Sequence, residues 1–171
     1  MRPIGSRWAA VVLPLAMGGC ALVGYPAPGP TSADPVTPTR EPRSRYGNPD
    51  SYEVFGDTYH VLATADGYEE EGLASWYGAE FEGRPTSSGE PFDPGRPSAA
   101  HRTLPIPTWV VVTNLDNGRE MVVRINDRGP FADPERRIID LSRAAAERLG
   151  VVGPGTARVR VRALSSEELA R

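Results

Sequence analysis

A β-type run that ends in a rigid polar turn, at residues 122–131, constrains the fold most strongly. Its side chains alternate in the manner of a strand until Asn126-Asp127, and Gly129-Pro130 then imposes a sharp turn. A rigid sheet is therefore needed to hold Asp127 and Arg128 at its edge, where polar loop residues often carry function. The structural alternative is an Asx-turn, in which Asp127 accepts hydrogen bonds from its own backbone amides and Arg128 is merely solvated.

Further β-type runs flank this segment. Residues 108–115 and 119–125 are joined by Asp116-Asn117-Gly118, which predicts a hairpin because Asn-Gly tolerates positive φ at both central turn positions. Residues 156–164 alternate cleanly and predict a half-buried strand that closes the sheet. Short strands separated by turns, in a chain with 18 Gly and 18 Pro among 171 residues, predict a mainly β fold, a compact barrel.

One helix is predicted within residues 137–150. Ser142 or Asp140 can cap its start, and the Ala-rich run that follows favours helix. Gly150 suits the left-handed residue after a helix end. The expected fold is therefore a β-barrel that carries one short helix.

The first 19 residues have the form of an export signal. A basic start is followed by an apolar run, residues 8–17, that is too short to span a bilayer as a mature helix. Met17-Gly-Gly-Cys20 resembles a bacterial lipoprotein signal, in which the cysteine is acylated and becomes the new N-terminus. Ala21 in place of Asp points, by the same resemblance, to an outer-membrane anchor and a periplasmic domain. An ordinary cleaved signal that leaves a free thiol is the alternative.

The remaining chain divides by composition. Residues 20–50 are rich in Pro, Ser, Thr, Gly and Arg and predict a disordered tether, because such a segment buries too little apolar surface to fold. Residues 51–71 form a lead-in arm that ends in an acidic run, expected to be an exposed turn. The barrel domain is predicted to span residues 72–164, and residues 165–171 form a tail.

Charge and metal-ligating residues exclude several classes of function. All 19 basic residues are Arg, 22 residues are acidic, and the net charge is -3. An acidic chain without a basic stripe is a poor nucleic-acid binder, and the alternating Arg158, Arg160 and Arg162 fit a solvated strand face. With a single Cys the chain can form neither an internal disulfide nor a Cys-based metal cluster, and two His do not favour a multi-His metal site. We therefore expect no metal and no cofactor.

Six short motifs occur in order along the domain, at residues 74–78, 86–90, 99–101, 113–118, 124–131 and 139–142. Together they resemble the RlpA family, the septal-ring, rare-lipoprotein-A-type lytic transglycosylases. The resemblance runs from about Tyr52 to Leu164 and implies a six-stranded double-psi β-barrel. Ser87 stands where the family usually has Ala. The SPOR domain that many members carry is absent, so recruitment to the septum by that route is not expected.

The resemblance also implies that Glu90, His101 and Asp127 are catalytic. Cleavage of a glycosidic bond requires a proton donor at the leaving oxygen, and Asp127 is the candidate. In a lytic transglycosylase the C6 hydroxyl of N-acetylmuramic acid attacks and a 1,6-anhydro sugar forms, so Asp127 can first donate and then accept a proton. His101 is expected to orient Asp127 or the sugar by a hydrogen bond. Glu90 is expected either to repel Asp127 electrostatically or to bind sugar hydroxyls.

Four further residues are candidates for substrate binding. Trp76 and Tyr77 form either a sugar-stacking platform or part of the aromatic core. Asn126 and Arg128 are expected to contact sugar or acetamido groups.

The leading hypothesis is an outer-membrane-anchored peptidoglycan lytic transglycosylase, lipidated at Cys20 and facing the periplasm. Its partners would be peptidoglycan glycan strands and proteins of division or wall synthesis. The main alternative is a noncatalytic, expansin-like peptidoglycan-binding or division-scaffold protein, since related barrels only bind polysaccharide. A hydrolytic glycosidase is a third option if Glu90 and Asp127 flank a cleft at roughly 6.5 to 9.5 Å.

Overall fold

The computed structural model of the chain describes residues 37–170. The predicted signal peptide, Cys20 and the first part of the predicted tether lie outside these residues. Within the described part, no helix is long and apolar enough to cross a membrane.

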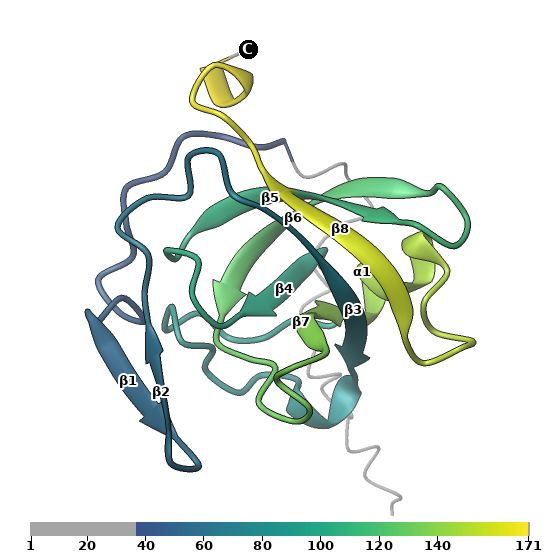
Figure 1. Cartoon of the computed structure of the whole chain (residues 1–171), viewed down its shortest axis with the longest axis horizontal. Helices are drawn as coiled ribbons and strands as arrows, with labels where there is room; N and C mark the ends of the chain where they lie inside the picture. The colour runs from purple at the N-terminus through teal and green to yellow at the C-terminus, as the bar shows by residue number, and fades with distance from the viewer. Residues whose placement is uncertain (1–36, 171) are drawn as a thin grey trace, which may run out of the picture. The chain divides into compact units, whose positions relative to one another are not determined.

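Six strands close into a barrel (Figure 1). Their order around it is β3-β7-β4-β6-β5-β8. The β3–β7 and β4–β6 pairs are parallel, and the other four neighbouring pairs are antiparallel. The strands are β3 (Glu69–Tyr77), β4 (Ser98–His101), β5 (Thr108–Asn114), β6 (Glu120–Asp127), β7 (Arg137–Ser142) and β8 (Ala157–Ala163). This closed mixed barrel confirms the mainly β fold expected from the sequence.

The strand order has an internal two-fold relation. Exchanging β3 with β6, β4 with β7 and β5 with β8 leaves every neighbouring pair and its relative direction unchanged. Two crossover segments are exchanged as well: residues 78–97 pass from β3 to β4 across β7, and residues 128–136 pass from β6 to β7 across β4. These interlocked crossovers are the double-psi arrangement, and both of them border the pair β4–β7.

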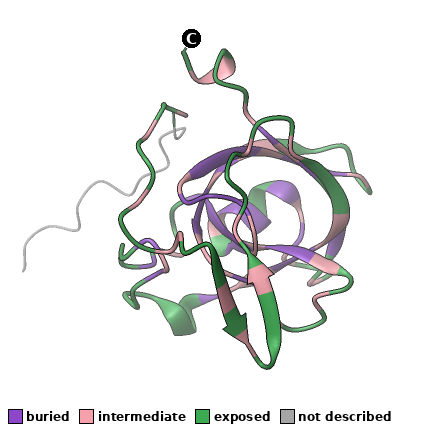
Figure 2. Cartoon of the chain, turned by 60° about the vertical axis from the view of Figure 1, so that its left-hand side comes forward, coloured by how far each residue is buried: buried purple, intermediate pink, exposed green. Residues whose placement is uncertain are grey.

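The barrel interior is filled by the alternating apolar residues of the strands. Val110 and Val112 of β5, together with Val159 and Val161 of β8, are completely buried. Figure 2 shows the buried residues lining the ring of strands, with exposed residues on the outside and on the hairpin β1–β2. Period-2 burial of this kind fixes the register, because a slip by one residue would expose the entire apolar set.

The helix forms where the sequence predicts it. Helix α1 (Arg143–Leu149) begins after Ser142, whose side chain accepts a hydrogen bond from the backbone N–H of Ala145. It ends at Gly150, which has φ 76° in the left-handed region. Ser142, rather than Asp140, is therefore the N-cap. Two 3-10 turns are also present, η1 (Ala79–Phe81) and η2 (Glu168–Ala170).

The acidic run at residues 69–71 is not a turn. These residues begin β3 and pair with β8, where Glu71 lies opposite Arg160. The two side chains form an ion pair with a 2.6 Å contact. By local composition, a run of three acidic residues resembles an exposed turn. Here a basic partner, Arg160 of β8, lies 89 residues further along the chain.

Polar contacts bind residues 41–48 to the barrel, although composition predicts a tether as far as residue 50. Glu41 pairs with Arg124 at 2.7 Å. Asn48 exchanges two hydrogen bonds of 2.7 Å with the backbone of Ile106. Individual side chains make these contacts, so apolar periodicity gives no sign of them.

A small hairpin precedes the barrel. Strands β1 (Ser51–Val54) and β2 (Asp57–His60) pair antiparallel around a turn at Phe55-Gly56, where both residues have positive φ. The ring of Tyr52 stacks on that of Tyr59 at 5.5 Å, and both rings contact Phe131. The hairpin is thus attached to the crossover that follows β6.

Candidate active site

Four residues from four neighbouring strands form a row across the barrel wall. Asp127 of β6 is in register with Ala100 of β4, Ala100 with Asp140 of β7, and Asp140 with Ser75 of β3. The two-fold relation of the strands exchanges Asp127 with Ser75, at the two ends of this row, and Ala100 with Asp140, at its centre. Two strand spacings separate Asp127 from Asp140, which puts their Cα atoms roughly 9.5 Å apart.

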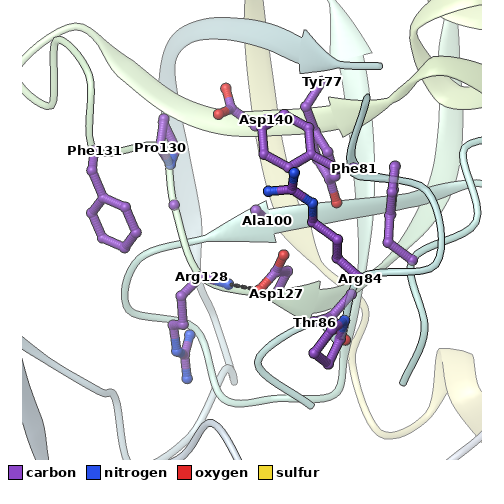
Figure 3. A pocket seen from close by; sticks show the side chains of 13 residues that line it. Tyr77, Phe81, Arg84, Thr86, Ala100, Asp127, Arg128, Pro130, Phe131 and Asp140 are labelled. Carbon is purple, nitrogen blue, oxygen red and sulfur yellow. Dashed lines mark hydrogen bonds between the residues drawn. The ribbon is translucent and has the colours of Figure 1, made fainter. Parts of the chain in front are cut away.

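A pocket of about 310 Å³ lies over this row, between the two crossovers (Figure 3). Both carboxylates line it, on two sides of the small Ala100 side chain. Its volume is at the lower end of the range for small-ligand pockets, so it suits the reacting part of a longer substrate. Other residues that line it are Tyr77, Phe81, Arg84, Phe92 and Phe131.

Asp127 is held by one oxygen and presents the other. Its Oδ1 accepts hydrogen bonds from the backbone N–H of Ser87 at 2.8 Å, from the Ser87 hydroxyl at 2.7 Å and from the backbone N–H of Arg128 at 2.8 Å. Within the described residues, Oδ2 has no hydrogen-bond partner and is not buried. The carboxyl group is therefore fixed in orientation and has one oxygen available to a ligand. The Ser87 hydroxyl supplies one of these three donors, which an alanine at this position would lack.

Asp140 is a site residue that the sequence analysis considered only as a helix cap. Its Oδ1 pairs with Arg137 at 2.5 Å and accepts a hydrogen bond from the Ser75 hydroxyl. Its neighbours Ile139 and Leu141 are completely buried. An acid between two core residues of a strand must face the opposite side, and this alternation is the signal that indicates its position.

Tyr77 places a buried hydroxyl group at the pocket. Its ring packs 4.4 Å from that of Phe92, and its hydroxyl oxygen is buried without a hydrogen-bond partner. Burial raises the pKa of Tyr77, and the nearby charges of Asp127 and Asp140 raise it further. The hydroxyl therefore keeps its proton at neutral pH, and it lies within the pocket wall beside Ser98. Trp76, the preceding residue, points to the other face of β3 and packs against the core.

His101 lies on the opposite face of β4 from the pocket. Its ring is 3 % exposed. Nδ1 accepts hydrogen bonds from the backbone N–H groups of Thr103 and Leu104, and Nε2 lies 2.8 Å from the hydroxyl of Tyr68. Because Nδ1 is an acceptor, Nε2 carries the proton and donates to Tyr68, which in turn donates to Glu70. Neither ring nitrogen contacts Asp127.

The protonation state of His101 follows from this environment. Burial lowers its pKa to about 3, and the positive charges of Arg102 and Arg128 act in the same direction. The imidazole is therefore neutral at physiological pH. The hydrogen bond from His101 to Asp127 that the sequence analysis expects is not among the contacts of the described residues.

Glu90 belongs to a neighbouring pocket, of about 370 Å³, that Asn126 and Arg124 also line. Its carboxylate pairs with Arg124 at 2.8 Å and accepts a hydrogen bond from Asn126 at 3.3 Å. Burial tends to raise the pKa of Glu90, but these two partners outweigh it and leave the pKa below its ordinary value. The Oδ1 atom of Asn126 is buried without a partner. Glu90 and Asn126 thus lie together, and Asp127 faces a different pocket.

The side chain of Arg128 is directed away from Asp127 (Figure 3). Its guanidinium group donates to the carbonyl oxygens of Gly47 at 2.6 Å, Leu104 at 2.6 Å and His101 at 3.0 Å. It therefore connects the segment before β1 to the loop after β4, and its donors are used within the protein.

The arrangement as a whole defines a class of site. Paired carboxylates at a pocket with aromatic walls can transfer protons to and from a sugar. In residues 37–170 no group of three or more His, Cys, Asp or Glu side chains is placed to hold a metal ion.

The chain belongs to the lytic transglycolase family, whose sequence profile matches residues 69–161. It is 51% identical over 131 residues to the endolytic peptidoglycan transglycosylase RlpA of Vibrio cholerae, covering 77% of this chain and 49% of that protein. It is 53% identical over 110 residues to the protein of that name from Pseudomonas aeruginosa, covering 64% and 32%. The family expected from the motifs is therefore confirmed, and the chain spans about half or less of these relatives' length. The solved structure of the Streptomyces papain inhibitor aligns with a TM-score of 0.45 at 24% identity, covering 58% of this chain and 96% of that one.

Proposed function

We propose that the protein is an endolytic peptidoglycan lytic transglycosylase that cleaves glycan strands between N-acetylmuramic acid and N-acetylglucosamine. The observation that carries the proposal is the carboxyl group of Asp127, held through Oδ1 by three donors and with Oδ2 free at a pocket. Support also comes from the family match, which includes this residue, and from the names of its relatives.

The reaction needs a proton at the glycosidic oxygen and an attack by the C6 hydroxyl of the same muramic acid residue. Asp127 donates the proton as the bond breaks. The nucleophile is already part of the substrate, so fixing the sugar in the pocket supplies much of the rate enhancement through proximity. The rings of Tyr77, Phe81 and Phe131 provide apolar walls. The product carries a 1,6-anhydro end.

The proposal extends to location. The lipoprotein-like signal at Met17-Gly-Gly-Cys20 supports a lipid anchor at Cys20 in the outer membrane, with the barrel in the periplasm. If residues 21–40 form the coil that their composition predicts, they would reach roughly 25 Å from the proposed anchor to Glu41, which contacts the barrel. Proteins of division or wall synthesis remain proposed partners.

A noncatalytic wall-binding protein is the second candidate. It is favoured by one observation, that Glu90, His101 and Asp127 do not contact one another and face different surroundings. In that case the two pockets would bind glycan without cleaving it.

The test is digestion of peptide-stripped glycan strands by the full chain, with the products weighed by mass spectrometry. We expect products that end in 1,6-anhydro sugars, lighter by one water than reducing-end products. Asp127→Asn should lower kcat by about 10² to 10⁴-fold, because it removes the proton donor. Asp57→Asn, the same change at an exposed position of β2, is the matched control and should act like wild type.

Two results would overturn the proposal. Reducing-end products would mean hydrolysis, and glycan binding without any soluble product would favour the noncatalytic candidate.

A further inference from the structure

We propose that Asp140 is a second catalytic carboxylate, which accepts the proton of the attacking C6 hydroxyl while Asp127 protonates the leaving oxygen. This inference rests on the proposed function and divides between two residues the roles of acid and base that Asp127 alone would otherwise perform.

The first observation is position. Asp127 and Asp140 line the same pocket, and the register of β6, β4 and β7 puts Ala100 alone between them (Figure 3). With Cα atoms roughly 9.5 Å apart, the two carboxyl groups leave space for one sugar ring with a hydrogen bond on each side. The small side chain of Ala100 leaves room there, and the guanidinium group of Arg84 points into the same pocket (Figure 3).

The second observation is that the two carboxyl groups are anchored in the same way. Each uses Oδ1 for all of its hydrogen bonds and ion pairs: Asp127 to Ser87 and Arg128, and Asp140 to Ser75 and Arg137. In each, within residues 37–170, Oδ2 has no partner and is not buried. Each carboxylate therefore has one oxygen free at the same pocket, and one ligand can contact both.

The third observation is the hydroxyl group of Tyr77. It is buried without a hydrogen-bond partner at the same pocket, and the charges of both Asp127 and Asp140 act on it. The charges of the two carboxylates therefore converge on one buried atom of the pocket wall.

The anchoring partners distinguish the two roles. Asp140 forms an ion pair with Arg137, whereas Asp127 accepts hydrogen bonds from two backbone N–H groups and one hydroxyl. On this difference in partners we assign the role of base to Asp140 and the role of acid to Asp127.

The proton balance closes over one cycle. Asp127 gives its proton to the glycosidic oxygen, the bond from C1 to that oxygen breaks, and the C6 oxygen bonds to C1 and loses its proton to Asp140. Asp127 is then ionised and Asp140 is protonated. One proton passes from Asp140 to Asp127 through water in the open pocket before the next turnover.

The other two residues predicted to be catalytic, His101 and Glu90, are less suited to the role of base. Both ring nitrogens of His101 are occupied on the far side of β4. Glu90 pairs with Arg124 in the neighbouring pocket. Asp140 is the acidic residue that shares the pocket with Asp127.

The experiment measures kcat, KM and the pH profile of the full chain on peptide-stripped glycan strands, for the wild type and for Asp140→Asn. We expect kcat to fall at least about 10²-fold with KM within a few-fold. The rise of rate with pH on the acidic side should disappear, because the group that must be ionised is gone. The double variant with Asp127→Asn should fall by less than the product of the single losses, since the two groups act in one step.

Controls separate this inference from the proposed function. Glycan co-sedimentation and near-UV circular dichroism check that Asp140→Asn is folded; if it is not, Asp140→Glu keeps the charge beside Arg137 and should still lose kcat, because its carboxyl group is displaced. An active wild type with Asp140 variants within about threefold of it in kcat, or with an unchanged acidic limb, would overturn the role of Asp140 alone. A wild type that yields no anhydro product would overturn the proposed function itself.

Discussion

The two faces of strand β4 differ in whether their polar groups have hydrogen-bond partners within the protein. On the side of Ala100, Asp127 and Asp140 each keep an oxygen that is free and accessible at a pocket. On the side of His101, the next residue, both imidazole nitrogens are hydrogen-bonded within the protein. Most buried polar groups in folded proteins are hydrogen-bonded, because each unpaired one costs about 1 to 3 kcal/mol. An oxygen without a protein partner costs less at an open pocket, where water or a ligand can donate a hydrogen bond to it.

This contrast suggests that the described residues divide into a side that stabilises the fold and a side that meets substrate. Arg128 follows Asp127 in the sequence, but its side chain belongs to the stabilising side. Its backbone N–H donates to Asp127, and its guanidinium group donates to three carbonyl oxygens elsewhere in the protein. Variants on the stabilising side should therefore change the free energy of unfolding, and those on the pocket side should change kcat.

The largest stability effect is expected from Arg128→Met. The change removes the donors to Gly47 and Leu104 and leaves their carbonyl oxygens without partners, at a cost of about 3 kcal/mol or more in the free energy of unfolding. Urea unfolding at pH 7 measures it. Arg84→Met, at an exposed pocket residue, is the control and should stay within about 0.5 kcal/mol of wild type. A raised KM with unchanged stability would instead mean that the Arg128 side chain contacts glycan.

The next effect concerns pH. His101 has a pKa of about 3 in the folded protein against about 6.5 in an unfolded chain. As pH falls below about 6.5, the unfolded state takes up a proton that the folded state does not, so stability decreases by up to about 1.4 kcal/mol per pH unit. The contribution is fully present above pH 6.5 and is lost progressively toward pH 3.

His101→Gln should remove this part of the pH dependence. Urea unfolding at pH 6 and pH 5 compares the slopes, with His60→Gln at an exposed position of β2 as the matched control. Equal slopes in wild type and His101→Gln would show that the imidazole is not held neutral by burial, and would weaken the division between the two faces of β4.

The smallest effect is expected from Glu90→Gln. Its pair with Arg124 is partly exposed, and Arg124 keeps its contact with Glu41, so stability should fall by less than about 1 kcal/mol. Because Glu90 faces the pocket beside that of Asp127, we expect a higher KM with little change in kcat. A fall in kcat of more than about tenfold in a folded variant would place Glu90 with the reacting groups. Glu147→Gln, which also loses one exposed ion pair, is the control.

The sequence by itself determined the strands β5, β6 and β8, the hairpin between β5 and β6, and the helix, but it did not predict β4 or β7 as strands. The alternation in residues 119–125 and the Asn117-Gly118 turn predict the pair β5–β6, and Ser142 and Gly150 do cap α1. These features depend on sterics and hydrogen bonds within a few residues, so they can be recognised locally. The motifs similarly indicated the barrel family, and Asp127 at the end of a strand.

Only the tertiary structure decided which polar groups meet. Barrel closure and the two interlocked crossovers set the register that brings Asp140 of β7 into the pocket of Asp127. The same register turns His101 to the opposite face, because successive side chains of a strand point to opposite sides. Contacts such as Glu41 with Arg124 join residues far apart in the chain. Local patterns do not encode these pairings, since they arise only when the strands are assembled.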